Sequence, residues 1–201
     1  MPQDREQAVA HIIYFMRHGE TNWNAEARLQ GQQDIPLNEV GRAQAVEAGR
    51  SLASVLPDPD SLPWQVSPLG RTRETAELAR KAIGLPPNRY KLEDRLKELT
   101  FGDWEGKTWA ELRSIDRNMV KARAADKWAY VPPRGESYAM LHDRIAGWLK
   151  TVNQNLVVVS HGGVARVLLV LLAGMATAEA AEAAIWQGKL LVFRGKAAEW
   201  V

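Results

Sequence analysis

Short apolar runs alternate with longer segments of helical character along this chain, and this alternation constrains the fold more than any other feature. We expect strands at residues 12–16, 64–67, 90–92, 156–160 and 190–193. Helices are expected at residues 38–55, 70–83, 108–115, 164–173 and from Ser137 to about Val152. Strands that alternate with helices form a parallel sheet covered by helices. The pattern therefore predicts an α/β fold, a three-layer αβα sandwich around a mostly parallel central sheet.

Residues 113–134 depart from this alternation. They are rich in Arg, Lys and Ala and contain Pro132 and Pro133 near their end, which is typical of a helix followed by a loop. Their cations either form a solvated basic face, which is the simpler interpretation, or bind substrate. No repeat, low-complexity tract or linker divides the chain, so we expect a single domain over residues 1–201.

Composition excludes several classes of function. The chain has 26 Lys and Arg against 24 Asp and Glu, and a net charge of +2 does not indicate a nucleic acid or membrane partner. The absence of cysteine removes disulfides, thiolate catalysis and most structural zinc sites. The polar start at residues 1–7 shows no secretory signal, and the longest apolar stretch, residues 167–173, is shorter than the ~20 residues that span a bilayer. We expect a cytoplasmic protein, in which an uncovered edge strand would support a homodimer.

Two of the expected strands end in a histidine followed by glycine. The run at 12–16 leads into Arg17, His18 and Gly19, and the run at 156–160 leads into His161, Gly162 and Gly163. In open α/β sheets, ligands bind beyond the carboxyl ends of the strands. The two histidines are therefore expected to share one pocket.

The motif Arg17-His18-Gly19-Glu20-Thr21, with Ser160-His161-Gly162-Gly163 far downstream, resembles the histidine phosphatase superfamily, also called the phosphoglycerate mutase-like family. Further motifs of that family match in the same order, at residues 28–37, 67–76, 96–106 and 135–137. The resemblance covers residues 12–195. An Arg-His-Gly triplet alone is weak, but these motifs together are specific.

The resemblance implies a phosphate site. His18 would attack phosphorus as a neutral imidazole and form a phosphohistidine. Arg17 and Arg71 would each donate two parallel N–H bonds to phosphate oxygens, and their charges would disfavour protonation of His18. His161 and Asn24 would add further donors.

The remaining site residues complete this scheme. Glu98 would protonate the departing alkoxide and then accept a proton from the attacking water. Gln30, Gly31 and Gly162 are expected to line the substrate site, and no metal or cofactor is needed. A zinc site on His18 and His161, completed by a carboxylate such as Glu98, is the competing interpretation of the two histidines.

Three functions use these residues. A phosphatase hydrolyses the phosphohistidine, a mutase transfers the phosphoryl group back to substrate, and a phospho-ligand-binding module does neither. The interval from Glu98 to His161 is short for the mutase branch, and Gly135-Glu136-Ser137 resembles the phosphatase branches, although Tyr130-Val131-Pro132-Pro133 resembles the mutase branch. We therefore expect a phosphatase that acts on a small phosphorylated metabolite.

Overall fold

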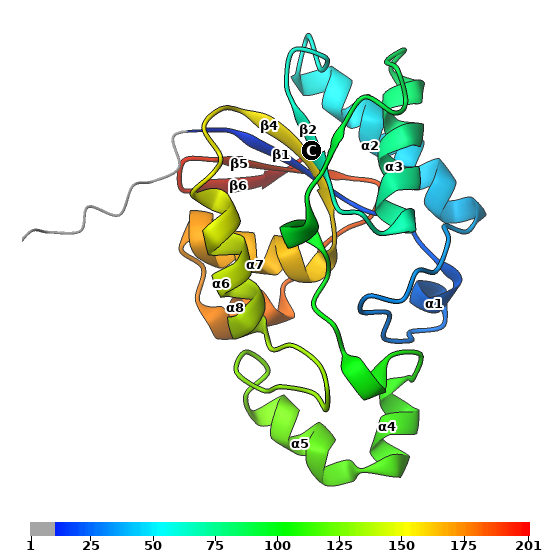
Figure 1. The fold of residues 1–201 in the computed structure, drawn as a ribbon, viewed down its shortest axis with the longest axis vertical. Helices are drawn as coiled ribbons and strands as arrows, with labels where there is room; N and C mark the ends of the chain where they lie inside the picture. Colours follow the sequence, from blue (N-terminus) through cyan, green and yellow to red (C-terminus); the bar gives the residue numbers. More distant parts are fainter. Residues whose placement is uncertain (1–10) are drawn as a thin grey trace, which may run out of the picture.

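A six-stranded sheet forms the centre of the computed structural model, which describes residues 11–201 (Figure 1). Its strand order is β3-β2-β4-β1-β5-β6. The strands are β1 (Ile13–Arg17), β2 (Trp64–Val66), β3 (Lys91–Leu92), β4 (Leu156–Ser160), β5 (Leu190–Arg194) and β6 (Ala197–Trp200). The pairs β2–β3, β2–β4 and β1–β4 are parallel, whereas β5 is antiparallel to both β1 and β6. The polar start at residues 1–7 lies outside the described residues.

Helices cover both faces of this sheet (Figure 1). α2 (Glu39–Val55) and α3 (Gly70–Ala82) lie on one face, and α6 (Tyr138–Leu149) and α7 (Gly162–Ala173) on the other, with α8 (Thr177–Glu182) beside α7. The three-layer α/β prediction is confirmed, with a mixed sheet at its centre. No helix within residues 11–201 has both the length and the apolar character that crossing a bilayer requires.

Strand β1 shows how the sequence divides the core between these two layers. Ile13 and Phe15 pack with α6 and α7, whereas Tyr14 and Met16 pack with α2 and α3. All four are 5% exposed or less, because β1 lies between β4 and β5 and is covered on both faces. A strand buried on both faces has a continuous apolar sequence rather than an alternating one.

The segment that contains α4 and α5 stands apart from the layers, at the bottom of Figure 1. α4 (Trp109–Ile115) begins at the capping box predicted from Thr108 and Glu111. α5 (Arg117–Ala125) follows, capped by Asp116, and a loop then leads to Ser137, which caps α6. The predicted helix and loop of the irregular segment are confirmed.

The strand at 190–193 is the last one predicted from the sequence, but a further strand, β6, follows it. β6 pairs with β5 at the sheet edge, and it carries the exposed Glu199 and Trp200 rather than an apolar run. Three helical elements that the sequence does not predict, α1 (Asn22–Ala25), η1 (Asp94–Leu96) and η2 (Gly102–Trp104), are single short turns. The helix α8 is also unpredicted. Segments of three to six residues are too short to show a helical period.

Two glycines bring α2 against the loop that follows β1. A Cβ atom on Gly19 would lie 2.1 Å from the carbonyl oxygen of Gly41, and one on Gly41 would lie 2.0 Å from that of Glu20. Asn38 caps α2 at the same place, where its side chain accepts a hydrogen bond from the Gly41 amide at 2.8 Å. Gly41 lowers the helical propensity of α2, but the close approach of two backbones requires it.

Candidate active site

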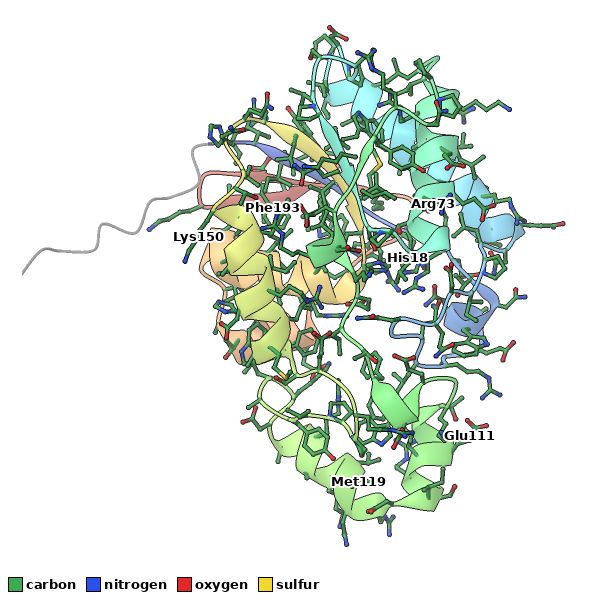
Figure 2. The ribbon with its side chains drawn as sticks, in the orientation of Figure 1. His18, Arg73, Glu111, Met119, Lys150 and Phe193 are labelled. Atoms are coloured by element: carbon green, nitrogen blue, oxygen red, sulfur yellow. The ribbon has the colours of Figure 1, made fainter. Side chains whose placement is uncertain are left out.

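The parallel register of β1 and β4 places the two strand-end histidines together. Arg17 is paired with Ser160, so the chain leaves both strands at the same edge of the sheet. The ring centroids of His18 and His161 are 5.2 Å apart, and both residues are buried. Figure 2 shows His18 near the middle of the molecule, with Glu111 of α4 and Met119 of α5 below it. Ser67, which follows β2, reaches the same point, since its Oγ lies 2.8 Å from Nε2 of His161.

The backbone determines which nitrogen of His18 carries the proton. Nδ1 lies 2.8 Å from the carbonyl oxygen of Gly19, and a carbonyl can only accept a hydrogen bond. Nδ1 of the neutral ring therefore carries the proton and donates it to Gly19. The lone pair of the neutral imidazole is left on Nε2, which is the form that a nucleophile requires.

Both histidines are held neutral by their surroundings. Burial lowers the pKa of His18 well below 6.5, and the nearby charges of Arg71 and Arg17 lower it further. The pKa of His161 is lowered in the same direction, again first by burial and then by Arg71. A cation in this position would be desolvated and repelled by two guanidinium groups.

Two arginines, the buried Arg71 and the half-buried Arg17, approach the histidines from different elements. Arg17 ends β1 and donates from Nη1 to the carbonyl oxygen of Ile185 at 2.7 Å. Arg71, in the first turn of α3, donates to the carbonyl oxygens of Gln33 at 2.6 Å and Gly31 at 2.7 Å. Burial lowers the pKa of both guanidinium groups, that of Arg17 to about 10. These hydrogen-bond partners are neutral carbonyl oxygens, so both positive charges remain available to an anion.

Four buried polar atoms of this region have no hydrogen-bond partner within residues 11–201. They are Nε of Arg17, Nε of Arg71, Nδ1 of His161 and Oε1 of Gln30. A buried polar atom without a partner costs about 1–3 kcal/mol, so native structures seldom retain one without a reason. All the atoms of this kind in the described part of the chain belong to residues that the sequence assigns to one site. This concentration indicates a ligand-binding position.

A cavity of about 160 Å³ lies at this end of the sheet, and we call it the strand-end cavity. Eight of the nine predicted site residues line it: Arg17, His18, Asn24, Gln30, Gly31, Arg71, Glu98 and Gly162. His161, the ninth, is fully buried beside His18. Six further residues also line it: Arg28, Leu29, Leu99, Phe101, Tyr138 and Arg166. The sequence analysis did not assign these six to the substrate site.

Backbone amides hold the carboxylate of Glu98 at the wall of this cavity. Oε1 accepts a hydrogen bond from the amide of Leu99, and Oε2 accepts one from the amide of Gly163 in the first turn of α7, both at 3.0 Å. A Cβ atom on Gly163 would lie 2.2 Å from Oε1 of Glu98. The second glycine after His161 therefore makes room for this carboxylate.

Asn24 is oriented by a residue that the sequence does not mark. Its Oδ1 accepts hydrogen bonds from the amide of Thr21 at 3.2 Å and from Nε2 of Gln187 at 3.1 Å. Because two donors occupy the oxygen, the amide nitrogen Nδ2 is the part of this side chain left for a ligand. Gln187 also donates to the carbonyl oxygen of His18 at 3.1 Å, so it joins the segment that carries His18 to Asn24.

Glu105 ties together the two loops that carry Gln30 and Glu98. Its Oε1 accepts hydrogen bonds from the amides of Gln32 at 3.1 Å and Phe101 at 3.0 Å. Gly31, with a φ of 53°, passes so close that a Cβ atom there would lie 1.9 Å from this oxygen. Glycine is required here both for the positive φ and for the close contact.

Of the two arginines in the first turns of α3, only Arg71 faces the pocket. Arg71 is 1% exposed and lines the cavity, whereas Arg73 is exposed. Arg73 forms no ion pair with Glu74 or Glu77 in the described part of the chain: Glu74 pairs with Arg42 at 2.7 Å, and Glu77 accepts a hydrogen bond from the hydroxyl of Tyr90 at 2.7 Å.

One cation of the basic segment is not solvated. Arg117 and Lys121 of α5 are exposed, as a basic solvated face predicts, but Arg123 is 8% exposed. Its Cζ lies 4.7 Å from the ring centroid of Trp109 and 6.0 Å from that of Phe101, which lines the strand-end cavity. Burial lowers the pKa of Arg123. We call residues 105–134, which contain α4 and α5, the cap.

The described residues include no group of three or more His, Asp or Glu side chains arranged as ligands for one metal ion.

Known proteins resemble the chain over most of its length. Phosphoglycerate mutase-like protein 4 of Arabidopsis thaliana is 35% identical over 175 residues, which cover 82% of this chain and 72% of the relative. An uncharacterized phosphatase, PhoE, of Bacillus subtilis is 32% identical over 170 residues, 81% of this chain and 77% of the relative.

A solved structure supports the same relationship. The crystal structure of a putative alpha-ribazole-5'-P phosphatase from Escherichia coli matches with a TM-score of 0.79 at 27% identity, over 96% of this chain and 95% of that one. A sequence model of the histidine phosphatase superfamily (branch 1) matches residues 13–201. The chain therefore belongs to the histidine phosphatase superfamily.

Proposed function

We propose that this protein is a metal-independent phosphomonoesterase that hydrolyses a small phosphorylated metabolite through a phosphohistidine at His18. The observation that carries the proposal is the position of His18. Its Nδ1 donates to the Gly19 carbonyl, and its Nε2 is free in a cavity with unpartnered nitrogen atoms from Arg17 and Arg71.

A phosphomonoester carries about 1.5 to 2 negative charges near neutral pH, and its oxygens accept several hydrogen bonds. Nε of Arg17 and Nε of Arg71 are buried donors without partners, and Nδ2 of Asn24 faces the same space. His161 adds Nδ1 as a donor when the hydroxyl of Ser67 donates to its Nε2. During transfer, negative charge spreads over the equatorial oxygens, so donors placed around the phosphate stabilise the transition state.

In the first step, Nε2 of His18 bonds to phosphorus as the bond from phosphorus to the ester oxygen breaks. Protonated Glu98 gives its proton to that oxygen, which leaves as an alcohol. In the second step, water attacks phosphorus, Glu98 takes the proton of the water, and the bond between phosphorus and nitrogen breaks. Phosphate is released, and His18 and Glu98 return to their starting states.

Mutase activity is the second candidate, because one relative is a phosphoglycerate mutase-like protein and Arg123 lies beside the cavity wall. A mutase returns the phosphoryl group to the bound substrate instead of to water. Both activities use the residues at the ends of β1 and β4, Arg17, His18 and His161, which we call the floor of the strand-end cavity. Only the products therefore distinguish the two activities.

The deciding experiment measures phosphate release from a panel of phosphomonoesters in the presence of EDTA, beside a mutase assay primed with 2,3-bisphosphoglycerate. We expect release with little isomerisation. Isomerisation without release would replace the proposal with mutase activity, and no turnover in either assay would favour a phospho-ligand-binding module.

A trapping experiment tests the intermediate directly. Rapid quenching with a ³²P-labelled substrate that turns over is expected to give an acid-labile, base-stable label on the protein. His18→Asn should give no label. A label of equal intensity on that variant would remove His18 as the nucleophile.

A further inference from the structure

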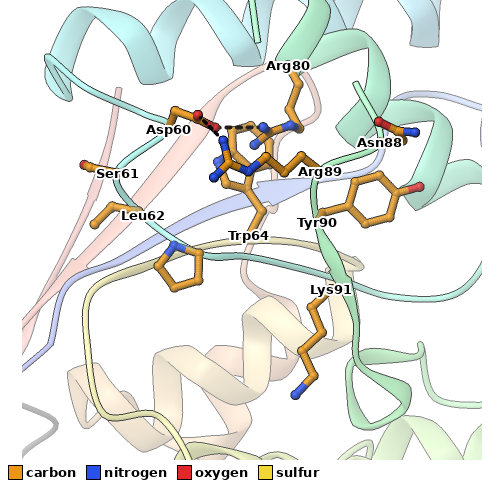
Figure 3. A pocket seen from close by; sticks show the side chains of 10 residues that line it. Asp60, Ser61, Leu62, Trp64, Arg80, Asn88, Arg89, Tyr90 and Lys91 are labelled. Carbon is orange, nitrogen blue, oxygen red and sulfur yellow. Dashed lines mark hydrogen bonds and ion pairs between the residues drawn. The ribbon is translucent and has the colours of Figure 1, made fainter. Parts of the chain in front are cut away.

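A second cavity lies at the opposite end of the sheet, where β2 and β3 begin (Figure 3). Trp64, the first residue of β2, and Lys91, the first residue of β3, line it together with the loop before β2. Its volume is about 440 Å³, compared with about 160 Å³ for the strand-end cavity. Cavities of about 300–1,000 Å³ hold small molecules in other proteins. We call it the strand-start cavity.

The walls of this cavity carry more positive than negative charge. Arg80, Arg89 and Lys91 line it, and Asp60 is the one carboxylate among the lining residues. Oδ1 of Asp60 accepts from Nη2 of Arg80 at 3.0 Å, and Oδ2 accepts from Nη1 of Arg89 at 2.8 Å, as the dashed lines in Figure 3 show. One carboxylate is thus shared by two guanidinium groups, and with Lys91 the lining has a formal charge of +2.

Arg80 makes the floor of the cavity a built structure rather than a chance surface. It is 1% exposed, its Cζ lies 4.8 Å from the ring centroid of Trp64, and its Nε donates to the carbonyl oxygen of Pro86 at 2.7 Å. Trp64 is itself 2% exposed and donates from Nε1 to the carbonyl oxygen of Pro59 at 3.1 Å. Nη1 of Arg80 forms no hydrogen bond within residues 11–201. A buried guanidinium therefore retains donors at the floor of an open cavity.

A purely structural role explains only part of this arrangement. One ion pair between Asp60 and Arg80 is sufficient to join the loop before β2 to α3. The second cation on the same carboxylate adds positive charge to this wall of the cavity, whereas the Lys91 side chain extends away from the two guanidinium groups (Figure 3). Such an excess of positive charge is expected where a bound anion neutralises it.

We propose that the strand-start cavity is a second, non-catalytic binding site for a small organic anion, whose phosphate or carboxylate group contacts Arg80 and Arg89, with Lys91 at a separate part of the lining for a further polar or anionic group. His18 lies at the other end of the sheet, so this ligand is not a substrate of the strand-end cavity. Asn88 supplies a neutral amide at the rim for the rest of the ligand.

The test is a titration followed by ¹H–¹⁵N NMR, with inorganic phosphate and citrate as separate probes and sodium chloride at matched ionic strength as the reference. Backbone amides of residues 88–91 report on the strand-start cavity, and those of His18 and Gly163 report on the strand-end cavity. We expect the amides at 88–91 to shift along a saturable curve whose midpoint differs from that of the His18 amide. Saturation by phosphate alone, by citrate alone or by both identifies the anionic group and supports the proposal.

The variant Arg89→Gln/Lys91→Gln removes two exposed cations and leaves the buried Arg80 in place. The anion concentration that half-saturates the shifts at residues 88–91 should rise at least about tenfold in this variant. The reason is that a hydrogen bond to a charged group contributes roughly that factor to affinity. The matched control is Arg194→Gln/Lys196→Gln, which removes an exposed Arg at the end of β5 and an exposed Lys in the turn to β6 and should leave the half-saturation concentration unchanged.

Three results would overturn the proposal: shifts at 88–91 that grow linearly with anion concentration, shifts that sodium chloride reproduces, or equal midpoints in the two double variants. The His18 amide in the same samples reports separately on phosphate binding at the strand-end cavity. Failure of this site therefore leaves the proposed phosphatase activity unaffected.

Discussion

The floor of the strand-end cavity and the cap differ in how they hold their charged groups. Arg17, His18 and His161 stand at the ends of two central strands, and the strand register determines their positions. Arg123 of the cap lies between aromatic rings on a helix outside the three layers. The floor is thus part of the core, whereas α4 and α5 of the cap lie outside it. Glu105, at the start of the cap, is the exception, because it holds the loops that carry Gln30 and Glu98. This division suggests that the floor performs the phosphate chemistry and that the cap selects the leaving group.

Loss of the nucleophile should have the largest effect and should be the same for every substrate. His18→Ala is expected to lower kcat by roughly 10⁵-fold or more, because removing a catalytic nucleophile has effects of that order. Steady-state phosphate release on the whole substrate panel measures it. His142→Ala, on α6 and away from the cavity, is the control. Substantial turnover by His18→Ala would show that the floor does not carry the chemistry.

Glu98→Gln should separate substrates by their leaving groups. General acid catalysis contributes about 10² to 10⁴-fold when the leaving group is a poor one such as an alkoxide. The phenolate of p-nitrophenyl phosphate needs little protonation, so its hydrolysis should fall much less. The ratio of the two losses in kcat is the measurement, and equal losses would remove Glu98 as the acid.

The free energy of unfolding should depend on pH because His18 and His161 have lowered pKa values in the folded protein. The folded pKa values of His18 and His161 lie well below 6.5, so the unfolded chain binds more protons once the pH falls below about 6.5. The free energy of unfolding is therefore not reduced by these histidines above that pH. Below it, the free energy of unfolding declines by up to about 2.7 kcal/mol per pH unit for two protons. Urea unfolding at a series of pH values measures the slope.

His18→Gln supplies the control for that slope. One titrating group remains, so the maximum decline should be about half as steep. An unchanged slope would mean that other groups cause the acid sensitivity.

A change in the cap should have the smallest effect and should alter substrate preference. Arg123→Gln is expected to lower kcat/KM for 3-phosphoglycerate by about tenfold relative to glycerol 3-phosphate, because these substrates differ in a carboxylate that a buried guanidinium would contact. Arg117→Gln, exposed on the same helix, is the matched control. An equal loss of kcat/KM on both substrates would mean that Arg123 acts on all substrates alike, as the floor residues do, and does not select the leaving group.

The floor was predictable from the sequence, and so were the helix and loop of the cap, but the roles of individual cap residues were not. Two apolar runs that end in histidine predict both the strands and the pocket, because the pocket lies at the ends of those strands. The role of Gln187 depends on a contact with His18 across 169 positions, and no local pattern precedes it. Arg123 has the same sequence context as the exposed Arg117 and Lys121, and only the packing of α5 against Trp109 distinguishes it. β6 was missed because an exposed edge strand lacks the apolar run that marks the central strands.

The contact between Gly19 and Gly41 limits the routes by which this scaffold could acquire a new substrate. Any side chain at either position would push α2 away from the loop that carries His18, so neither residue can be replaced in a single mutational step without displacing the nucleophile. Substitutions selected for new substrates should therefore accumulate in the cap. A combinatorial library that leaves these two glycines and Glu105 unchanged and varies the residues of α4 and α5 would sample sequences that keep the arrangement of the site residues.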